Sequence, residues 1–354
     1  AATIAAFVRK PHPSLLTLDD LDTVAQYIED NYTKNPLRGY IHGAVFPNSG
    51  YTNPALKDEK RIEYFGPYLY SYRDTPTSGA EPCACCGALS AHRIARDYFP
   101  LISGRGVINF YPWGESGLPI CGKCLLSVQA YPLGSGGFML IVHSDNDDLT
   151  YHFAHRFLEH NRTAIQLARL AGDKKMLGAR FSHRTLLIDT LLQAAQMQED
   201  ETRDEKLFSV TAYLLSNSGQ RPSLTIYKLP IEMIGFLREM QSADYYQEWN
   251  AIVRRAWEVA PQKKGGKRKD EKPFQPRRNW IYEDLFSLPN NAAKFLRTYF
   301  LRIALRHARG RTDPRGGYSL QAEGNLVSWK ITERFLRRIL HMDKERVEQI
   351  RAMG

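Results

Sequence analysis

The sequence predicts an α+β fold, in which an N-terminal mixed α/β domain with a four-cysteine zinc site is followed by a mainly helical, basic C-terminal part. Three observations predict it. Short apolar runs and frequent prolines dominate the first third of the chain, and stretches with helical periodicity dominate the rest. The first 124 residues also hold two Cys-x-x-Cys pairs. With 354 residues, of which 43 % are apolar, the chain can bury a sizeable core.

The N-terminal α/β region is expected to span residues 1–147. Its clearest helix is predicted from Thr17 to Asn31, because apolar residues recur along one face and Thr17 or Asp19 suits the N-cap. Closely spaced prolines predict loops and short strands over Asn35–Thr77. Two longer strands are predicted at Val107–Tyr111 and Phe138–His143.

A helical region with one hairpin is expected over residues 148–260, packed on the N-terminal region. The acidic run Glu199–Glu205 is predicted to be a loop, and Leu207–Leu215 is predicted to pair with Ser223–Leu229. Three helices are predicted from the spacing of apolar residues. They run from Asp148 to Gly172, from Arg184 to Met197, and from Pro230 to Ala260, the last either continuous or broken near Ser242.

Residues 261–278 (PQKKGGKRKDEKPFQPRR) form a predicted basic linker, because two glycines and three prolines interrupt a charged run. A basic helical region is expected over residues 279–354. Two amphipathic helices are predicted within it, Asn291–Arg309 and Trp329–Met353.

The positive charge is concentrated at the C-terminal end. The whole chain carries a net charge of +10, but residues 261–354 alone hold 22 lysines and arginines against 10 aspartates and glutamates, a net charge of +12. A local excess of this kind indicates a polyanionic partner. The alternative is a basic surface that serves solubility alone.

The cysteines predict a structural zinc site. Cys83 and Cys86 form one pair, and Cys121 and Cys124 form the other after an interval of 34 residues. Two residues between cysteines allow both sulfurs of a turn to face one ion, and two such turns complete a tetrahedral thiolate shell. Because four thiolates leave no open position, we expect zinc to be structural. Cys85 is the spare thiol, expected to be small and partly buried.

Other chemistry was weighed against this prediction. Pro82-Cys83-x-x-Cys86 matches half of the zinc deaminase signature, but the required His-x-Glu is absent, since Gly43-Ala44 follows His42. A redox Cys-x-x-Cys would not need two pairs. The carboxylates Asp145, Asp147 and Asp148 are interpreted as a turn that leads into a helix cap rather than as a nuclease site. No phosphate-binding loop or hydrolase motif occurs, so we expect a protein that is not an enzyme.

The candidate nucleic-acid contacts lie in the basic end of the chain. A basic arm can follow a phosphate backbone. On the predicted helix 291–309, four cations share one third of the circumference beside an apolar face; a solvated helix face is the alternative. The candidates are Lys263, Lys264, Lys267, Arg268, Lys269, Lys272, Arg277 and Arg278 in the linker, and Lys294, Arg302, Arg306 and Arg309 on the helix.

The segments around the second cysteine pair resemble a known family. They are Asn109-Phe110-Tyr111-Pro112, residues 117–134 (GLPICGKCLLSVQAYPLG) and Leu140-Ile141-Val142-His143-Ser144 before a long helix. The chain resembles, over residues 80–170, the large subunit of type I CRISPR Cascade complexes, in the subfamily that carries paired Cys-x-x-Cys zinc motifs.

The resemblance implies a cytoplasmic, prokaryotic, non-catalytic subunit. It would recognise the protospacer-adjacent motif, bind CRISPR RNA and target double-stranded DNA, and support R-loop formation. Its further partners would be other Cascade subunits and a helicase-nuclease or transposition proteins, with no membrane contact. The alternative is a stand-alone zinc-ribbon DNA- or RNA-binding regulatory factor.

Overall fold

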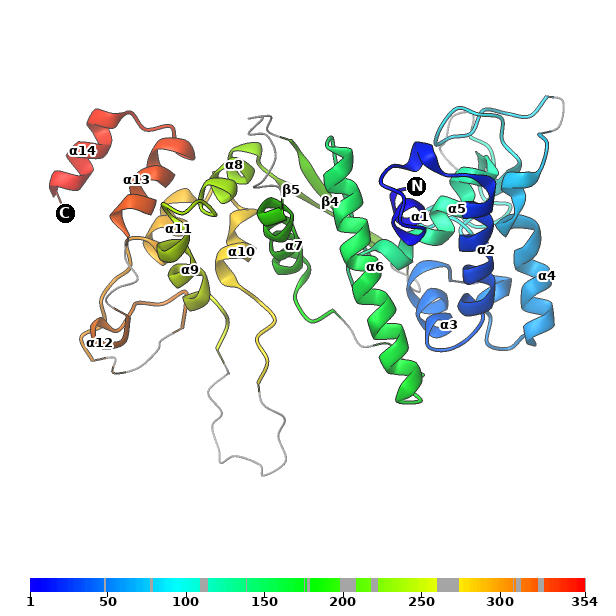
Figure 1. Cartoon of the computed structure of the whole chain (residues 1–354), viewed down its shortest axis with the longest axis horizontal. Coiled ribbons are helices and arrows are strands. Elements are labelled where there is room, and N and C mark those ends of the chain that lie inside the picture. Colours follow the sequence, from blue (N-terminus) through cyan, green and yellow to red (C-terminus); the bar gives the residue numbers. More distant parts are fainter. Residues whose placement is uncertain are drawn as a thin grey trace. The chain divides into compact units, whose positions relative to one another are not determined.

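The computed structural model describes residues 1–47, 49–76, 79–108, 114–137, 139–174, 176, 179–197, 208–217, 222–259, 274–307, 309, 313–323 and 328–353. Helices predominate, and the strands are few and short (Figure 1). The predicted α+β fold class is therefore confirmed.

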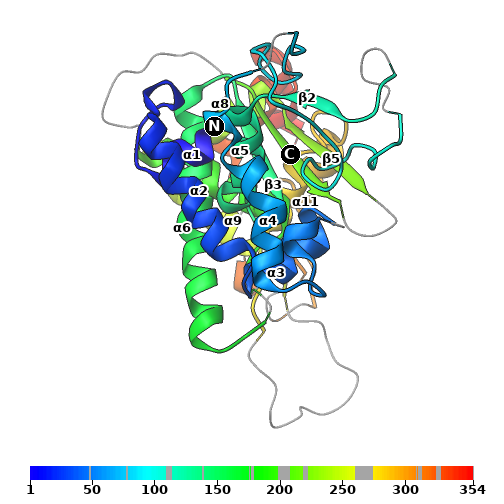
Figure 2. The same cartoon turned by 90° about the vertical axis from the view of Figure 1, so that its right-hand side faces the viewer.

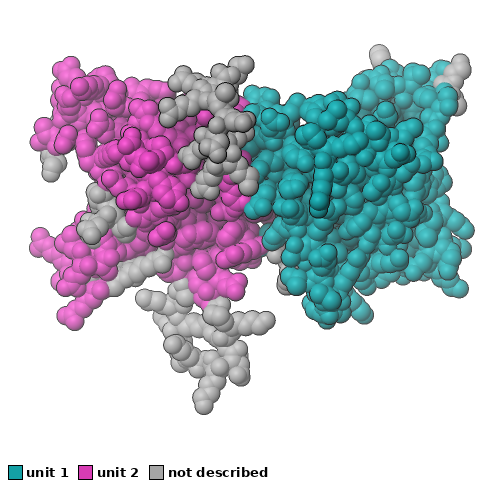
Figure 3. Space-filling view, viewed as in Figure 1, with its two compact units in different colours: residues 1–179, 212–226 teal, residues 180–211, 227–354 magenta. Residues whose placement is uncertain are grey.

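The chain divides into two compact units (Figure 3). Unit 1 comprises residues 1–179 and 212–226, and unit 2 comprises residues 180–211 and 227–354. The chain passes between the units at residue 180 and again within two neighbouring strands. The long helix after residue 147 thus belongs to the same unit as the cysteines.

Unit 1 contains six α-helices among its described residues. They are α1 (Ala2–Phe7), α2 (Leu18–Tyr32), α3 (Leu37–Tyr40), α4 (Asp58–Leu69), α5 (Gly122–Ala130) and α6 (Asp147–Leu170). The predicted helix 17–31 is confirmed as α2, because Thr17 and Asp20 form a reciprocal capping box at its start. Helix α6 is also confirmed, and it ends two residues before the predicted stop at Gly172.

The core of unit 1 lies between α2, α4 and α5, and α2 and α4 run side by side in Figure 1 and Figure 2. The rings of Tyr51 and Phe65 stack there with centroids 4.0 Å apart. The buried Gln129 side chain of α5 accepts the Tyr51 hydroxyl at 2.9 Å and donates to the Tyr98 carbonyl at 2.8 Å. The backbone carbonyl of Gln129 accepts the Tyr32 hydroxyl at 2.8 Å. One glutamine therefore joins three segments to α5.

The strands in the described part of the chain form two small sheets. β1 (His92–Ile94) pairs antiparallel with β2 (Leu118–Ile120). A second sheet has the order β3-β4-β5, formed by β3 (Leu140–Ser144), β4 (Val210–Ser216) and β5 (Ser223–Leu229). The predicted hairpin is confirmed by β4 and β5, although β4 begins three residues later than expected.

Two strand predictions need correction or fall partly outside the described residues. Of the strand predicted over 107–111, only residues 107 and 108 are described, and Ile108 forms an isolated antiparallel bridge with Ser116; residues 109–111 lie outside the described part. The strand predicted from Phe138 begins at Leu140 instead. The acidic run 199–205 also lies outside the described residues.

Unit 2 is mainly helical. Among its described residues, the α-helices are α7 (His183–Met197), α8 (Ile231–Glu239), α9 (Tyr246–Arg255), α10 (Trp280–Leu285), α11 (Ala292–Tyr299), α12 (Leu320–Glu323), α13 (Trp329–Arg338) and α14 (Lys344–Met353). Aromatic rings fill its core: Phe295 stacks on Phe335 at 5.3 Å, and Phe236 meets both Phe335 and Trp249 edge to face. The α7 prediction and the break near Ser242, between α8 and α9, are confirmed.

Two C-terminal helix predictions are wrong in length. The helix predicted over 291–309 ends at Tyr299, because the following residues extend and pair with Tyr318. The Leu305 N–H donates to the Tyr318 carbonyl at 2.7 Å, and the Tyr318 N–H donates to the Ile303 carbonyl at 2.9 Å. The helix predicted over 329–353 is two helices, and His341 between them has a φ of 51°.

Most of the predicted linker, residues 261–273, lies outside the described part of the chain. Its two flanks are fastened to each other in unit 2, since Trp257 and Asn279 form an antiparallel bridge. The buried Asn279 also donates to the Val253 carbonyl at 2.9 Å. The four-part domain division expected from the sequence stays a prediction.

Candidate metal centre and predicted nucleic-acid contacts

The first cysteine pair lies in a tight turn before β1. The Cys85 N–H points at the Cys83 sulfur at 3.4 Å, and the Gly87 N–H donates to the Cys83 carbonyl at 2.9 Å. Gly87 has a φ of +74°, a left-handed conformation that glycine adopts without strain. The local sequence therefore folds the turn that points both sulfurs to one side.

The second cysteine pair lies at the start of α5. β2 delivers Cys121 to the N-cap position, and Cys124 follows in the first helical turn. Backbone hydrogen bonds hold the two turns together: the Ala84 N–H donates to the Pro119 carbonyl and the Ala91 N–H to the Ile120 carbonyl, both at 2.9 Å. The β1–β2 register therefore brings the two pairs together despite their distance in sequence.

The four predicted sulfur ligands form one cluster. The sulfurs of Cys83, Cys86, Cys121 and Cys124 all lie within 4.8 Å of one another, and those of Cys86 and Cys121 are 3.6 Å apart. A tetrahedral ion with metal–sulfur bonds of about 2.3 Å would set its sulfurs about 3.8 Å apart. The cluster has the dimensions of a metal site, and no other such group occurs among the residues the structure describes.

The surroundings of the cluster give its thiols different pKa values. Burial raises the pKa of the Cys121 thiol to about 12. Burial also acts to raise the pKa of Cys83, but backbone N–H groups of Cys121, Cys85 and Cys86 outweigh it and lower that pKa to about 7. A bound cation must therefore displace protons from this cluster, as thiolate coordination requires.

Cys85 lies outside the four-sulfur cluster, as expected for the spare thiol. Its burial differs from the expectation, because Cys85 is exposed, not partly buried. A hydrogen bond with Cys124 lowers the pKa of its thiol.

Gly122, expected from the sequence only to suit the tight turn of the second cysteine pair, has a packing role that the sequence did not predict. Gly122 is the first residue of α5, and its α-carbon packs against the backbone of the Ser71–Tyr72 turn. A β-carbon there would lie 2.1 Å from the Tyr72 nitrogen. This contact seats the second cysteine pair against the core. The only hint of it in the sequence is the position of Gly122 directly after Cys121, inside the second Cys-x-x-Cys motif.

The residues considered for deaminase or nuclease chemistry have structural roles. His42 pairs with the Thr52 hydroxyl at 3.0 Å and is not part of the cysteine cluster. Asn146 caps α6, and Asp147 and Asp148 occupy its first turn, so the prediction of a helix cap is confirmed.

The predicted nucleic-acid contacts of the linker fall mostly outside the described residues. Those outside are Lys263, Lys264, Lys267, Arg268, Lys269 and Lys272. Arg277 and Arg278 are described and exposed. The Arg278 guanidinium lies 5.7 Å from the centre of the Trp280 ring.

The four predicted cations of helix 291–309 do not share a helix face, because α11 ends before three of them. Lys294 is exposed on α11, while Arg306 and Arg309 are exposed beyond its end. Arg302 is half-buried: it donates to the Gly317 carbonyl at 3.1 Å and lies over the Tyr318 ring. Desolvation lowers its pKa. Arg302 therefore holds the chain together locally and is a poor candidate for a nucleic-acid contact.

Comparison with known proteins adds no relative: no family model, no curated protein and no solved structure matches the chain. None of the helices in the described ranges combines the length and apolarity that a membrane crossing needs.

Proposed function

We propose that the chain is a non-catalytic, nucleic-acid-binding subunit of an RNA-guided DNA-targeting complex, with structural zinc in its four-cysteine centre. The observation that carries the proposal is the segment 117–134. It resembles Cascade large subunits, and its residues form one continuous part of the fold of unit 1. It comprises β2, the second cysteine pair, α5 and the buried Gln129.

The donor set supports zinc. Four thiolates in a tetrahedral arrangement suit Zn²⁺, and the closed shell leaves no position for water or substrate. Cys83 and Cys121 belong to the hydrophobic core cluster of unit 1, so the ion would join the loop-rich segment around β1 to α5. Zinc in this place would stabilise the fold and take no part in a reaction.

Metal analysis tests the zinc assignment. We expect purified protein to contain about one zinc per chain, since one four-thiolate shell holds one ion. Cys121→Ser should lose the metal and disrupt folding, whereas Cys85→Ser should retain both metal and fold. Stably folded protein without metal would reject the assignment.

In the proposed complex, guide pairing reads the target sequence, and this subunit contacts the adjacent motif, CRISPR RNA and the duplex. Its partners would be the other Cascade subunits and a helicase-nuclease or transposition proteins. The net charge of +12 in residues 261–354 supports contact with phosphate backbones.

Copurification from the native cytoplasm decides between this proposal and its alternative. A Cascade subunit should bring down a small repeat-derived RNA together with several backbone proteins. The alternative, a stand-alone zinc-ribbon regulatory factor, is favoured by one feature, the β1–β2 pair with a cysteine turn at one end of each strand. Such a factor would bind nucleic acid without those proteins.

The salt dependence of DNA binding tests the exposed cations. For the assembled complex, replacing Arg306 and Arg309 by glutamine should reduce the slope of log K against log salt by about 1 per lost phosphate contact. Arg337→Gln, which changes an exposed arginine on α13, serves as the control. An unchanged slope would reject Arg306 and Arg309 as DNA contacts.

A further inference from the structure

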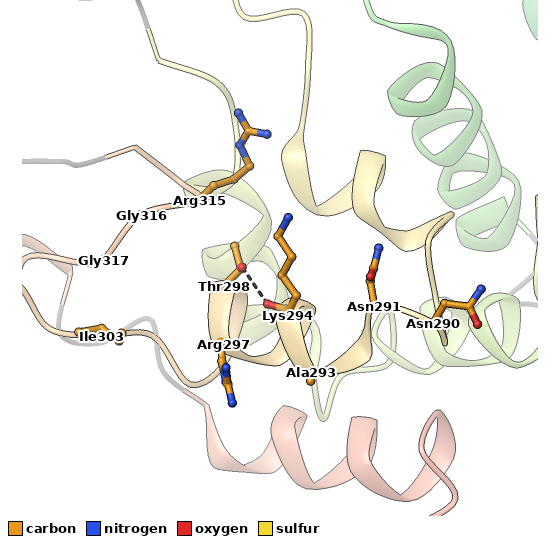
Figure 4. Close-up of a pocket in the computed structure, with 10 residues that line it drawn as sticks. All are labelled: Asn290, Asn291, Ala293, Lys294, Arg297, Thr298, Ile303, Arg315, Gly316 and Gly317. Carbon is orange, nitrogen blue, oxygen red and sulfur yellow. Dashed lines mark hydrogen bonds between the residues drawn. The ribbon is translucent and has the colours of Figure 1, made fainter.

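A cleft of about 530 Å³ opens beside α11 in unit 2 (Figure 4). Three cations and three neutral polar side chains line it: Lys294, Arg297, Arg315, Asn290, Asn291 and Thr298. Ligand sites of roughly 300–1,000 Å³ hold molecules of nucleotide size. Arg297 and Arg315 were not among the candidates that the sequence suggested.

None of the described carboxylates forms a salt bridge with the cations of this cleft, Lys294, Arg297 and Arg315. No described carboxylate lines the cleft either. Elsewhere in the same unit, Arg334 and Arg338 both pair with Glu239. The cleft therefore gathers three cations without salt-bridge partners among the described carboxylates, whereas Arg334 and Arg338 are paired.

The start of α11 adds to this potential. Helix N-termini are positively polarised and are commonly balanced by acidic residues or a side-chain cap. The first turn of α11 has no acidic residue and carries Lys294, and the N-cap residue Asn291 makes no capping hydrogen bond with its side chain. An anion in the cleft would supply the missing negative charge.

A ring contact and backbone hydrogen bonds hold Arg315 in place. Its guanidinium lies 3.7 Å from the centre of the Trp280 ring, and its backbone N–H donates to Asp313 at 2.8 Å. The Gly316 N–H closes the same turn on the Asp313 carbonyl at 2.9 Å, and Arg302 ties Gly317 to the chain after α11. A fixed guanidinium is suited to bidentate binding of a phosphate.

We propose that this cleft binds a ligand with at least two phosphate groups. Figure 4 shows Lys294, Arg315 and Asn291 extending to one side of α11 and Arg297 extending to the other. One phosphate would lie against Lys294 and Arg315, and a second would approach Arg297. The exposed Ile303 side chain gives the cleft an apolar wall for a sugar or base. Two sources share this chemistry, a nucleoside polyphosphate and the backbone of a nucleic acid.

The test uses the full chain with its metal and two probes, inorganic pyrophosphate by calorimetry and a fluorescent single-stranded oligonucleotide by anisotropy. Whichever of the two probes binds the native chain should bind the double variant Lys294→Gln, Arg315→Gln more weakly. The loss should be on the order of tenfold to a hundredfold per removed cation, because hydrogen bonds to charged groups are strong. Arg297→Gln should weaken it less, and the exposed control Arg337→Gln should leave it unchanged.

Binding of pyrophosphate alone would support the proposal with a small polyphosphate as ligand. Binding of the oligonucleotide, lost in the double variant, would support it with a nucleic-acid backbone as ligand. Binding of neither probe, or equal binding by the double variant with its circular dichroism spectrum unchanged, would overturn it. The proposal stands apart from the RNA-guided complex: pyrophosphate binding needs no partner subunit, and a failed copurification would leave the cleft assignment intact.

Discussion

Substituting Gly122 by alanine should disrupt the candidate metal centre although none of its four cysteines is changed. The added β-carbon would lie 2.1 Å from the Tyr72 nitrogen, 2.2 Å from the Ser71 carbonyl carbon and 2.3 Å from the Ser71 oxygen. All three atoms belong to backbone, so no side chain can rotate away. Separations below 3.0 Å essentially never occur for a real β-carbon, so α5 or the turn must move by about 0.9 Å.

A movement of this size matters because Gly122 is the first residue of α5, directly after Cys121 and two before Cys124. Metal–sulfur distances tolerate deviations of only about 0.2 Å. Overpacking in a well-packed interior costs about 1–3 kcal/mol, and a clash with backbone belongs at the upper end of that range. We therefore expect Gly122→Ala to lose both folding free energy and metal affinity.

The assay combines urea unfolding with transfer of the metal to a chromogenic chelator. Gly43→Ala is the matched control, because Gly43 lies in the helical segment Ile41–Val45 and a β-carbon there meets nothing within 4 Å. The control should be neutral or stabilised by about 0.5–1 kcal/mol, as for glycine to alanine within a helix. If Gly122→Ala matches this control in both stability and metal retention, the packing of α5 on the Ser71–Tyr72 turn is not as described.

Three further predictions concern the metal, a buried ion pair and a capping box. Lowering the pH should release a metal bound by the four cysteines, because protons compete for the thiolates, and a metal-sensitive dye would report it; a metal content that does not change with pH would contradict thiolate ligation. Glu323→Gln should lower the free energy of unfolding of unit 2 by about 3–5 kcal/mol in urea, because it leaves Arg255 buried and charged. The double variant Arg255→Met, Glu323→Leu should regain most of this loss. An equal loss of stability in the single and the double variant would refute the ion pair. Hydrogen bonds from Lys10 and Thr17 lower the pKa of Asp20 from 3.8 to about 2, so its stabilising effect should be complete above pH 4 and disappear as the pH falls toward 2. Asp20→Asn should lack this pH dependence in thermal unfolding, and identical pH profiles for the two proteins would exclude it.

The local signals in the sequence were reliable where one segment decides its own structure. Thr17 and Asp20 define the start of α2 through contacts three residues apart, and Asn146 does the same for α6. The cysteine spacing predicted the four-sulfur cluster, since each Cys-x-x-Cys turn forms locally. The 34 residues between the pairs did not prevent this prediction, because loop closure costs little more for longer loops.

The predictions failed where distant residues compete for the backbone. Leu296, Tyr299 and Ile303 repeat at helical spacing, yet the helix ends because the backbone after it pairs with Tyr318. Intrinsic propensity is a weak preference that such pairing overrides. Because α11 ends at Tyr299, Arg302 is half-buried and bonded to Gly317, and the four predicted cations do not share one helix face.

The sequence by itself determined the fold class, the four sulfur ligands and the concentration of positive charge beyond residue 260. Composition and short spacings carry these properties, and they do not depend on the path of the chain. Only the tertiary structure decided that Gly122 seats the metal centre and that Arg315 joins Lys294 in one cleft. These relations arise from close packing between segments far apart in the chain, and no local pattern encodes which surfaces will meet.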